Sequence, residues 1–253
     1  MLLCIDIGNT NITFGLYEGK ELGPRWRIRT IHEKTADEYG ILIDQLFRHQ
    51  GCRSDQVTGI SVASVVPPLT PTFEQVCREY LGQAPFVVDA GVKTGVRIRY
   101  ETLEIGADRV VDAAAVRALY SVPACVVDFG TATIFDAITA EGDYLGGAIA
   151  PGIGIAAQAL YEHTAKLHRV ELSRPPSAIG RNTTHAIQAG LLFGFVGLVE
   201  GMVARFKAEL GPQTLVIATG GLAEIVARET TMIDVVDPWL TLHGLRIVYE
   251  LNR

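Results

Sequence analysis

The sequence predicts an α/β protein built from two similar units, each with a mixed β-sheet flanked by helices. Apolar runs typical of strands alternate with segments of helical periodicity, a short segment near the beginning recurs at mid-chain, and glycine turns follow the strands. The chain has 253 residues, of which 48% are hydrophobic and 20% charged. This composition excludes an intrinsically disordered chain, and the length suffices for two domains.

The prediction of two units rests on an internal repeat. Residues 125–134 align without a gap over residues 3–12, and each copy has an apolar strand that ends in an aspartate, Asp6 or Asp128, followed by a glycine turn. Repetition at half the chain length implies duplicated α/β domains. We expect these domains to span residues 1–119 and 120–253 and to face each other across a cleft.

In the first half, a hairpin precedes two pairs of strand and helix. Residues 2–7 and 13–17 are predicted strands, because the glycine and asparagine residues between them favour a turn. Thr35 and Glu38 form a capping box, which predicts a helix over residues 36–50. The remaining elements are a strand over 59–66, a helix from 70 to 81, a strand over 86–88, a candidate strand over 96–100 and a helix over 108–119.

The second half adds one unusually long helix. Its expected elements are strands over 124–134, a strand over 144–148, a helix after residue 151, a helix over 183–210, a strand over 214–218, a helix after residue 221 and a closing segment over 238–250. In the long helix Gly190, Gly194, Gly197 and Gly201 recur every three or four residues, although each glycine costs about 1 kcal/mol relative to alanine. Either the chain's own sheet or another subunit therefore approaches this face closely.

Charge and cysteine usage narrow the range of partners. The 22 Lys and Arg against 28 Asp and Glu give a net charge of −6, which argues against nucleic acid and favours small molecules. The four cysteines lie far apart, which favours buried free thiols over a zinc site or a disulfide framework. The uncharged residues 186–199 are fewer than the about 20 that cross a bilayer. We expect a cytoplasmic protein without a signal peptide or a membrane partner.

The two acidic turns are candidate phosphate sites. Each places a carboxylate at a strand end beside backbone N–H groups and short polar side chains, which can surround a phosphate. One such turn alone is most often a plain hairpin, but two in register favour phosphate binding. Mg²⁺ uses one or two carboxylates together with substrate phosphates, so Asp6 is a candidate magnesium contact.

A third glycine turn follows an apolar strand in the second half. Gly220 and Gly221 open a helix there, and backbone without side chains suits an adenosine lying flat on it. A tight turn from strand to helix explains the two glycines equally well.

Seven segments together resemble a known family. They are Asp6-Ile-Gly-Asn-Thr-Asn11, Ser64-Val-Val-Pro-Pro-Leu-Thr70, Gly106-Ala-Asp-Arg109, Val127-Asp-Phe-Gly-Thr-Ala132, Gly146-Gly-Ala-Ile-Ala-Pro-Gly152, Ile179-Gly-Arg-Asn-Thr183 and Ala218-Thr-Gly-Gly221. On these motifs, which cover nearly the whole chain, the sequence resembles the type III pantothenate kinases of the acetate and sugar kinase, heat-shock-protein-70 and actin superfamily. The resemblance implies duplicated ribonuclease-H-like, actin-like ATPase domains. It also implies ATP-dependent phosphorylation of pantothenate to 4′-phosphopantothenate, the first step of coenzyme A biosynthesis.

The resemblance also implies a role for individual residues. Asp108 matches the catalytic base, and Asp128 matches the carboxylate near a monovalent cation, K⁺ or NH₄⁺. Thr183 matches a pantothenate contact that reaches across from the second subunit of a homodimer. The residues implied in binding ATP and its phosphates are Asp6, Gly8, Asn9, Thr10, Asn11, Gly130, Thr131, Ala132, Gly220 and Gly221, and those implied in binding pantothenate are Tyr100, Gly106, Ala107, Asp108, Arg109 and Thr183.

Residue chemistry by itself leaves alternatives open. Asp108 suits a base that accepts the proton of an alcohol, but an aspartate in the first turn of a helix also interacts favourably with the helix dipole. Arg109 suits the carboxylate of pantothenate, or it is a surface residue. Two other functions remain: a kinase for another small hydroxylated acid or sugar, and a nucleotide-binding accessory factor in transcriptional control.

Overall fold

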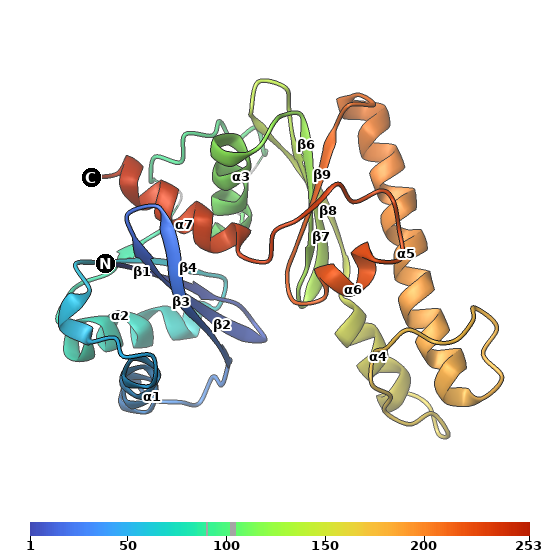
Figure 1. Cartoon of the computed structure of the whole chain (residues 1–253), viewed down its shortest axis with the longest axis horizontal. Coiled ribbons are helices and arrows are strands. Elements are labelled where there is room, and N and C mark those ends of the chain that lie inside the picture. Colours follow the sequence, from blue (N-terminus) through green and yellow to red (C-terminus); the bar gives the residue numbers. More distant parts are fainter. Residues whose placement is uncertain (90, 102–104) are drawn as a thin grey trace. The chain divides into compact units, whose positions relative to one another are not determined.

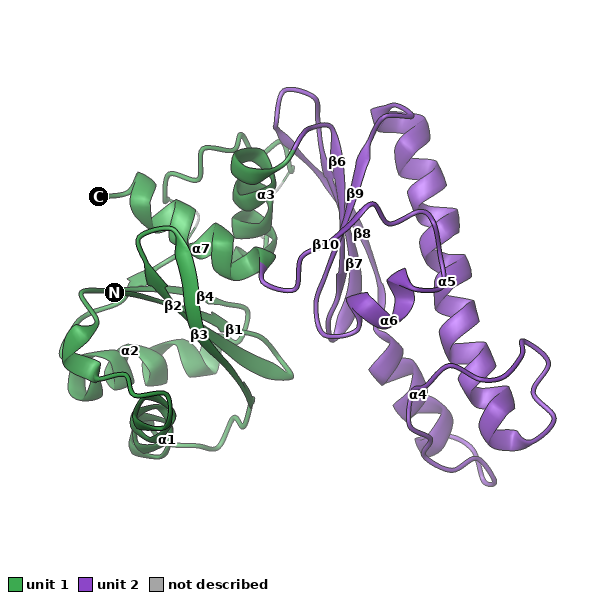
Figure 2. Cartoon of the chain, in the orientation of Figure 1, with its two compact units in different colours: residues 1–120, 240–253 green, residues 121–239 purple. Residues whose placement is uncertain are grey.

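The chain divides into two compact units, residues 1–120 together with 240–253 and residues 121–239 (Figure 2). The computed structural model describes residues 1–89, 91–101 and 105–253. The predicted division left residues 240–253 in the second domain, whereas helix α7 (Leu240–Leu251) packs on helix α3 (Ala107–Leu119) of the first unit. Gly244 permits this contact, because a Cβ there would lie 2.0 Å from the carbonyl oxygen of Val111.

Unit 1 is built on a five-stranded mixed sheet. The strand order is β3-β2-β1-β4-β5, in which β1 is antiparallel to β2 and parallel to β4. The strands are β1 (Leu2–Ile7), β2 (Asn11–Glu18), β3 (Glu21–Arg29), β4 (Gly59–Ser64) and β5 (Phe86–Val87). Strand β3 does not appear among the predicted elements, and the candidate strand over 96–100 is only an isolated bridge at Ile98.

Helices cover both faces of this sheet, so consecutive residues of its central strands are buried. Leu3, Ile5 and Phe14 point to one face and form a core with helices α1 (Ala36–His49) and α2 (Thr70–Tyr80). The predicted capping box of α1 is confirmed, because Thr35 and Glu38 each accept a hydrogen bond from the other's backbone N–H. Short 3₁₀ helices, Ser54–Gln56 and Pro67–Leu69, precede β4 and α2. The face that carries α1 and α2 therefore holds one apolar core of unit 1.

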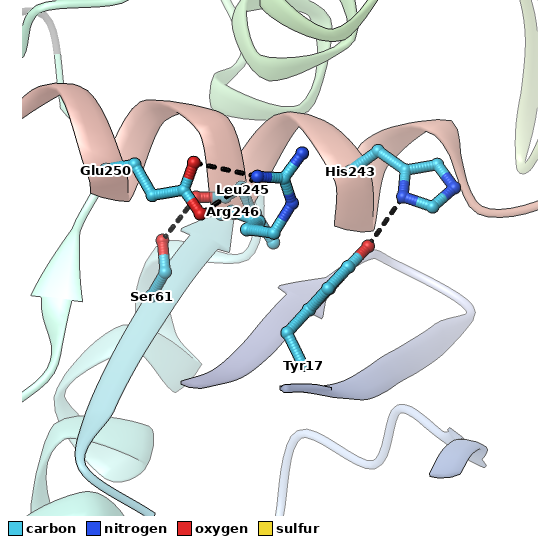
Figure 3. A network of polar contacts seen from close by, with 6 residues as sticks. All are labelled: Tyr17, Ser61, His243, Leu245, Arg246 and Glu250. Carbon is cyan, nitrogen blue, oxygen red and sulfur yellow. Dashed lines mark hydrogen bonds and ion pairs between the residues drawn. The ribbon is translucent and has the colours of Figure 1, made fainter. Parts of the chain in front are cut away.

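Helix α7 crosses the opposite face of the sheet (Figures 1 and 3). The hydroxyl of Tyr17 lies 2.7 Å from Nδ1 of His243, and the hydroxyl of Ser61 donates to the carbonyl of Leu245 at 3.1 Å (Figure 3). The buried guanidinium of Arg246 lies 5.6 Å from the centre of the Tyr17 ring. These contacts hold α7 against β1, β2 and β4.

Unit 2 repeats the topology of unit 1. Its strand order, β8-β7-β6-β9-β10, has the same sequence of antiparallel and parallel pairs, which confirms the predicted duplication. The strands are β6 (Ala124–Phe129), β7 (Ala132–Ile138), β8 (Tyr144–Pro151), β9 (Leu215–Thr219) and β10 (Val235–Val236). Ile7 pairs with Ile12 but Phe129 pairs with Thr133, so the second turn is one residue shorter. The gapless alignment is therefore wrong by one residue in β7.

Helix α5 (Thr183–Leu210) covers the core of unit 2, together with α4 (Ile153–Glu162) and α6 (Ala223–Ala227). Among the described residues, α5 is the one helix that is long and apolar enough to cross a membrane by length and composition. The apolar part of this helix is therefore longer than the uncharged segment 186–199 of the sequence. Only 44% of its most apolar window is buried in the chain. A Cβ on Gly190, Gly194 or Gly197 would meet no described atom within 4 Å. Close packing inside the chain therefore does not explain these three glycines.

The cysteines are free thiols, as predicted, and three of them are buried. Burial raises the pKa of Cys77 and of Cys125 to about 12, and it raises the pKa of Cys4 further despite the nearby charge of Arg246. These three side chains are therefore neutral at physiological pH and pack as small apolar groups.

Candidate active site

The turn between β1 and β2 is held by the residue that follows β3. The hydroxyl of Thr30 donates to the carbonyl of Gly8 at 2.6 Å, and its backbone N–H donates to the carbonyl of Thr10 at 3.0 Å. The N–H of Gly8 donates to the carbonyl of Asn11 at 3.0 Å. The carbonyl oxygens of Gly8, Thr10 and Asn11, which would repel an anion, thus each accept a hydrogen bond from the chain itself. The side chains of Asn9, Thr10 and Asn11 remain exposed.

Sequence reasoning missed Thr30 because it missed β3. A signal was present: Arg25, Arg27 and Arg29 alternate with Trp26 and Ile28, the two-residue period of a strand. Trp26 and Ile28 pack against the apolar core, whereas the three arginines are exposed on the other face. The high charge of the segment obscured this pattern.

Asp6 and the beginning of α3 lie at the same end of the unit 1 sheet. Asp6 is the last residue but one of β1, and the N–H of Val65, directly after β4, donates to the carbonyl of Ile7 at 3.0 Å. A Cβ on Gly106, which precedes α3, would lie 3.3 Å from Cγ1 of Val65. The motif that contains Asp108 thus adjoins the strand end beside the acidic turn.

The carboxylate of Asp108 folds back over the start of α3. Its Oδ1 accepts a hydrogen bond from the N–H of Arg109 at 2.8 Å, one of the N–H groups that a helix leaves unpaired in its first turn. A Cβ on Gly106 would lie 2.4 Å from the same oxygen, so this conformation needs a glycine there. Asp108 therefore interacts with the start of α3, as the alternative role at the helix dipole expected.

Arg109 is a buried residue, which excludes the surface alternative. It is 8% exposed, and its Cζ lies 5.9 Å from the centre of the Tyr100 ring, within the range of a cation–π contact. The structure thus brings together two residues that the resemblance implies in pantothenate binding, a cation and an aromatic ring.

In unit 2, Asp128 and two glycine turns converge. Asp128 pairs with Thr219 across β6 and β9, and a Cβ on Gly220 would lie 2.4 Å from Oδ1 of Asp128. Gly220 has a φ of +89°, which favours glycine whether or not a nucleotide binds there. The N–H of Gly130 donates to the carbonyl of Ala132 at 3.0 Å, which closes the second acidic turn. Thr131 lies within that turn, and Gly221 directly follows Gly220.

Thr183 lies apart from these groups within unit 2. It is the first residue of α5, and among the described residues it is the one predicted site residue that lines a cavity of about 850 Å³ between α4 and α5. Most of that lining is apolar, with Arg181 and Asn182 as its charged and amide groups. The structure of this single chain shows Thr183 at the rim of an apolar hollow, and its contact with a substrate stays a prediction.

A magnesium ion carried by a nucleotide needs few ligands from the protein. Among the residues described, no group of three or more His, Cys, Asp or Glu side chains is close enough to hold an ion. Mg²⁺ needs only one or two carboxylates when phosphates supply other ligands. Asp6 and Asp128 each supply one carboxylate near a strand end, and carboxylate oxygens fit hard cations in this way.

A family model matches most of the chain. Residues 2–205 match the family model described as type III pantothenate kinase. Type III pantothenate kinases from Moorella thermoacetica and Brevibacillus brevis are 54% and 52% identical, each over 100% of both chains.

Solved structures support the fold. A Campylobacter jejuni protein assigned to the Baf family of transcriptional activators has a TM-score of 0.61 at 19% identity, covering 98% of this chain and 97% of that one. The polyphosphate/ATP-glucomannokinase of an Arthrobacter strain has a TM-score of 0.51 at 16% identity, covering 99% and 97%. The family model and the full-length identities show that the chain belongs to the type III pantothenate kinase family.

Proposed function

We propose that Asp108 is the base in the transfer of the γ-phosphoryl group of ATP to the terminal hydroxyl of pantothenate. Membership of the family supports the overall reaction, which yields 4′-phosphopantothenate for coenzyme A biosynthesis. The observation that carries the assignment of Asp108 is its place at the start of α3, beside the strand end that adjoins the acidic turn of β1.

The reaction needs little from the chain beyond positioning and charge. The hydroxyl oxygen of pantothenate forms a bond to the γ-phosphorus, the bond from that phosphorus to the bridging oxygen of ADP breaks, and ADP leaves. The proton of the hydroxyl passes to the carboxylate of Asp108 as the new bond forms, because a primary alcohol hardly ionises at neutral pH.

Arg109 and Tyr100 form the proposed pantothenate contact. A guanidinium binds a carboxylate in a bidentate manner, and pantothenate carries one carboxylate. Burial of Arg109 removes competing water, which strengthens this ion pair. The Tyr100 ring lies within cation–π distance of the guanidinium, 5.9 Å from its Cζ to the ring centre. Gly106 and Ala107 complete this segment with backbone that allows close approach of the substrate.

Two cations belong to the proposal. Asp6 would hold Mg²⁺ carried by the nucleotide, and Asp128 would hold K⁺ or NH₄⁺. When bound, these cations would supply positive charge that offsets the negative charge of the phosphates. The turn residues Gly8, Asn9, Thr10 and Asn11 would bind phosphates from unit 1, and Gly130, Thr131, Ala132, Gly220 and Gly221 would bind the nucleotide from unit 2. A cytoplasmic location is proposed on the same grounds, since ATP and K⁺ are abundant there.

A homodimer completes the proposed enzyme. The exposed glycines of α5 leave room for another helix. The neighbouring helix α4 exposes the large apolar side chains of Ile155, Leu160 and Tyr161, and Leu160 lines the same cavity as Gly190. Sedimentation of the wild-type chain is expected to give a dimer, and replacing Gly194 by tryptophan is expected to give a monomer with the helix intact. A wild-type monomer that is fully active would contradict both the dimer and the proposed contribution of Thr183.

The reaction is tested by incubating the chain with Mg–ATP and pantothenate, first with K⁺ and then with Na⁺, and detecting phosphopantothenate by mass spectrometry. We expect product with K⁺ and little with Na⁺. Absence of product in both incubations would refute the proposed reaction. A panel of other small hydroxylated acids and sugars, followed by ADP release, distinguishes pantothenate from an alternative acceptor.

A further inference from the structure

We propose that two arginines of β3, Arg27 and Arg29, bind the phosphate chain of the nucleotide. The proposal rests on the proposed function, because it adds two binding residues to the phosphate site at the acidic turn of unit 1. Together with Arg25, these residues are called the arginine row.

Strand register aligns the arginine row with the acidic turn. Arg27 pairs with Thr13 across β3 and β2, and Thr13 pairs with Asp6 across β2 and β1. Arg29 pairs with Asn11, the last residue of the turn. Directly paired residues of neighbouring strands point to the same face of a sheet. Arg27 and Asp6 therefore share one face, two strand spacings or about 10 Å apart.

The end of β3 is fixed relative to this turn. Thr30, the next residue after Arg29, donates one hydrogen bond each to the carbonyls of Gly8 and Thr10. Arg29 thus has a defined place next to the exposed side chains of the turn. A triphosphate bound at the turn would lie within reach of both guanidinium groups, which bind phosphate oxygens in a bidentate manner.

The second unit provides an internal comparison. The row of side chains that corresponds to Asp6, Thr13 and Arg27 consists there of Asp128, Ile134 and Ile149. Ile149 is 65% exposed, so this edge position accepts an apolar residue without being part of a core. The same sheet topology therefore forms without positive charge at this position.

The positive charges on β3 also destabilise the strand through their mutual repulsion. Alternate positions of a strand lie about 6.7 Å apart, so three guanidinium groups on one face of an edge strand repel one another. The chain as a whole carries a net charge of −6, so this concentration of positive charge is local. A polyanion bound beside Arg27 and Arg29 would offset part of the repulsion, and a nucleoside triphosphate is the polyanion that the proposed reaction uses.

Titration calorimetry with Mg–ATP and with adenosine tests the proposal on three variants of the full chain. Arg27→Gln and Arg29→Gln are each expected to weaken ATP binding about 10-fold or more, which corresponds to the loss of one hydrogen bond to a charged group. Binding of adenosine should not change. Arg25→Gln removes the same charge from the same face, but Arg25 pairs with Gly15, farther from the turn, and a change below about 2-fold is expected.

The ionic-strength dependence and a conservative variant complete the test. The losses should shrink as salt rises, because salt screens an exposed ion pair. Arg27→Lys keeps the charge and should recover part of the affinity, and circular dichroism verifies the fold of each variant. Unchanged ATP affinity in Arg27→Gln and Arg29→Gln, or an equal loss in Arg25→Gln, would overturn the proposal while phosphopantothenate formation by the wild type still stands. A wild type that neither binds ATP nor forms product would instead refute the proposed function.

Discussion

Replacing Thr30 by valine removes one hydroxyl and keeps the shape of the side chain. The lost hydrogen bond to the carbonyl of Gly8 is short, 2.6 Å, and Thr30 is only 8% exposed. Loss of the donor for such a carbonyl costs about 1–3 kcal/mol. If this free energy maintains the phosphate-binding conformation of the turn, the Kd for Mg–ATP rises about 5- to 150-fold, since each 1.4 kcal/mol is tenfold.

The assay is calorimetric titration with Mg–ATP, accompanied by steady-state kinetics in both substrates. The KM for ATP should rise, whereas the KM for pantothenate should stay near the wild-type value. Thr30→Ser keeps the hydroxyl and should restore most of the affinity. Thr58→Val is a matched control, because the hydroxyl of Thr58 also donates to a backbone carbonyl, that of Met1, at the opposite end of the same sheet.

Two results would refute this reasoning. One is wild-type ATP affinity in Thr30→Val. The other is an equal loss in the serine variant, which would mean that the methyl group and its packing matter and the hydroxyl does not. A loss of thermal stability without any change in KM would likewise assign the hydrogen bond to folding alone.

Three further variants address the base, the second unit and the packing of α7. Asp108→Asn should lower kcat by about 10²- to 10⁴-fold with little change in ATP affinity, as measured by ADP release and calorimetry; near-normal turnover would place the base elsewhere. Gly220→Ala should weaken ATP binding and activation by K⁺, because its Cβ would displace the carboxylate of Asp128 and φ is positive there; unchanged K⁺ activation would contradict the proposed cation site. Gly244→Ala should lower the free energy of unfolding in urea by about 1–3 kcal/mol, since its Cβ would collide with the carbonyl of Val111; an unchanged midpoint would contradict the close approach of α7 to α3.

The sequence was sufficient to predict the local structure of those candidate site segments in which consecutive residues meet one local requirement. The turn after Asp6 and the segment from Gly106 to Arg109 each combine a strand end or helix start with a glycine that permits close approach. Requirements of this kind act over a few residues, so they leave a recognisable motif. The capping box that begins α1 was predictable for the same reason.

Contacts between residues far apart in sequence were not predictable in this way. The return of α7 to unit 1 depends on Gly244 meeting a backbone carbonyl more than a hundred positions earlier, and no local pattern indicates it. Strand β3 was missed because an edge strand with one solvated face accepts charged residues, which lower its strand propensity. The error in β7 arose because one residue fewer in the turn shifts the register of the following strand without disturbing the motif before it.

Comparison of the two units separates the contacts that folding of this topology requires from those found in unit 1 alone. In both units the residue after the third strand donates its N–H to a carbonyl in the acidic turn: Thr30 to Thr10 at 3.0 Å, and Gly152 to Thr131 at 3.1 Å. The additional hydroxyl bond exists only in unit 1, because the corresponding residue of unit 2 is Gly152, which has no side chain. A larger residue does not fit there, since a Cβ on Gly152 would lie 2.3 Å from the carbonyl oxygen of Thr131. A unit of this topology therefore closes its turn with the backbone bond alone. It follows that Thr30→Val should leave the hairpin folded, and that its effect should appear in the binding of phosphate.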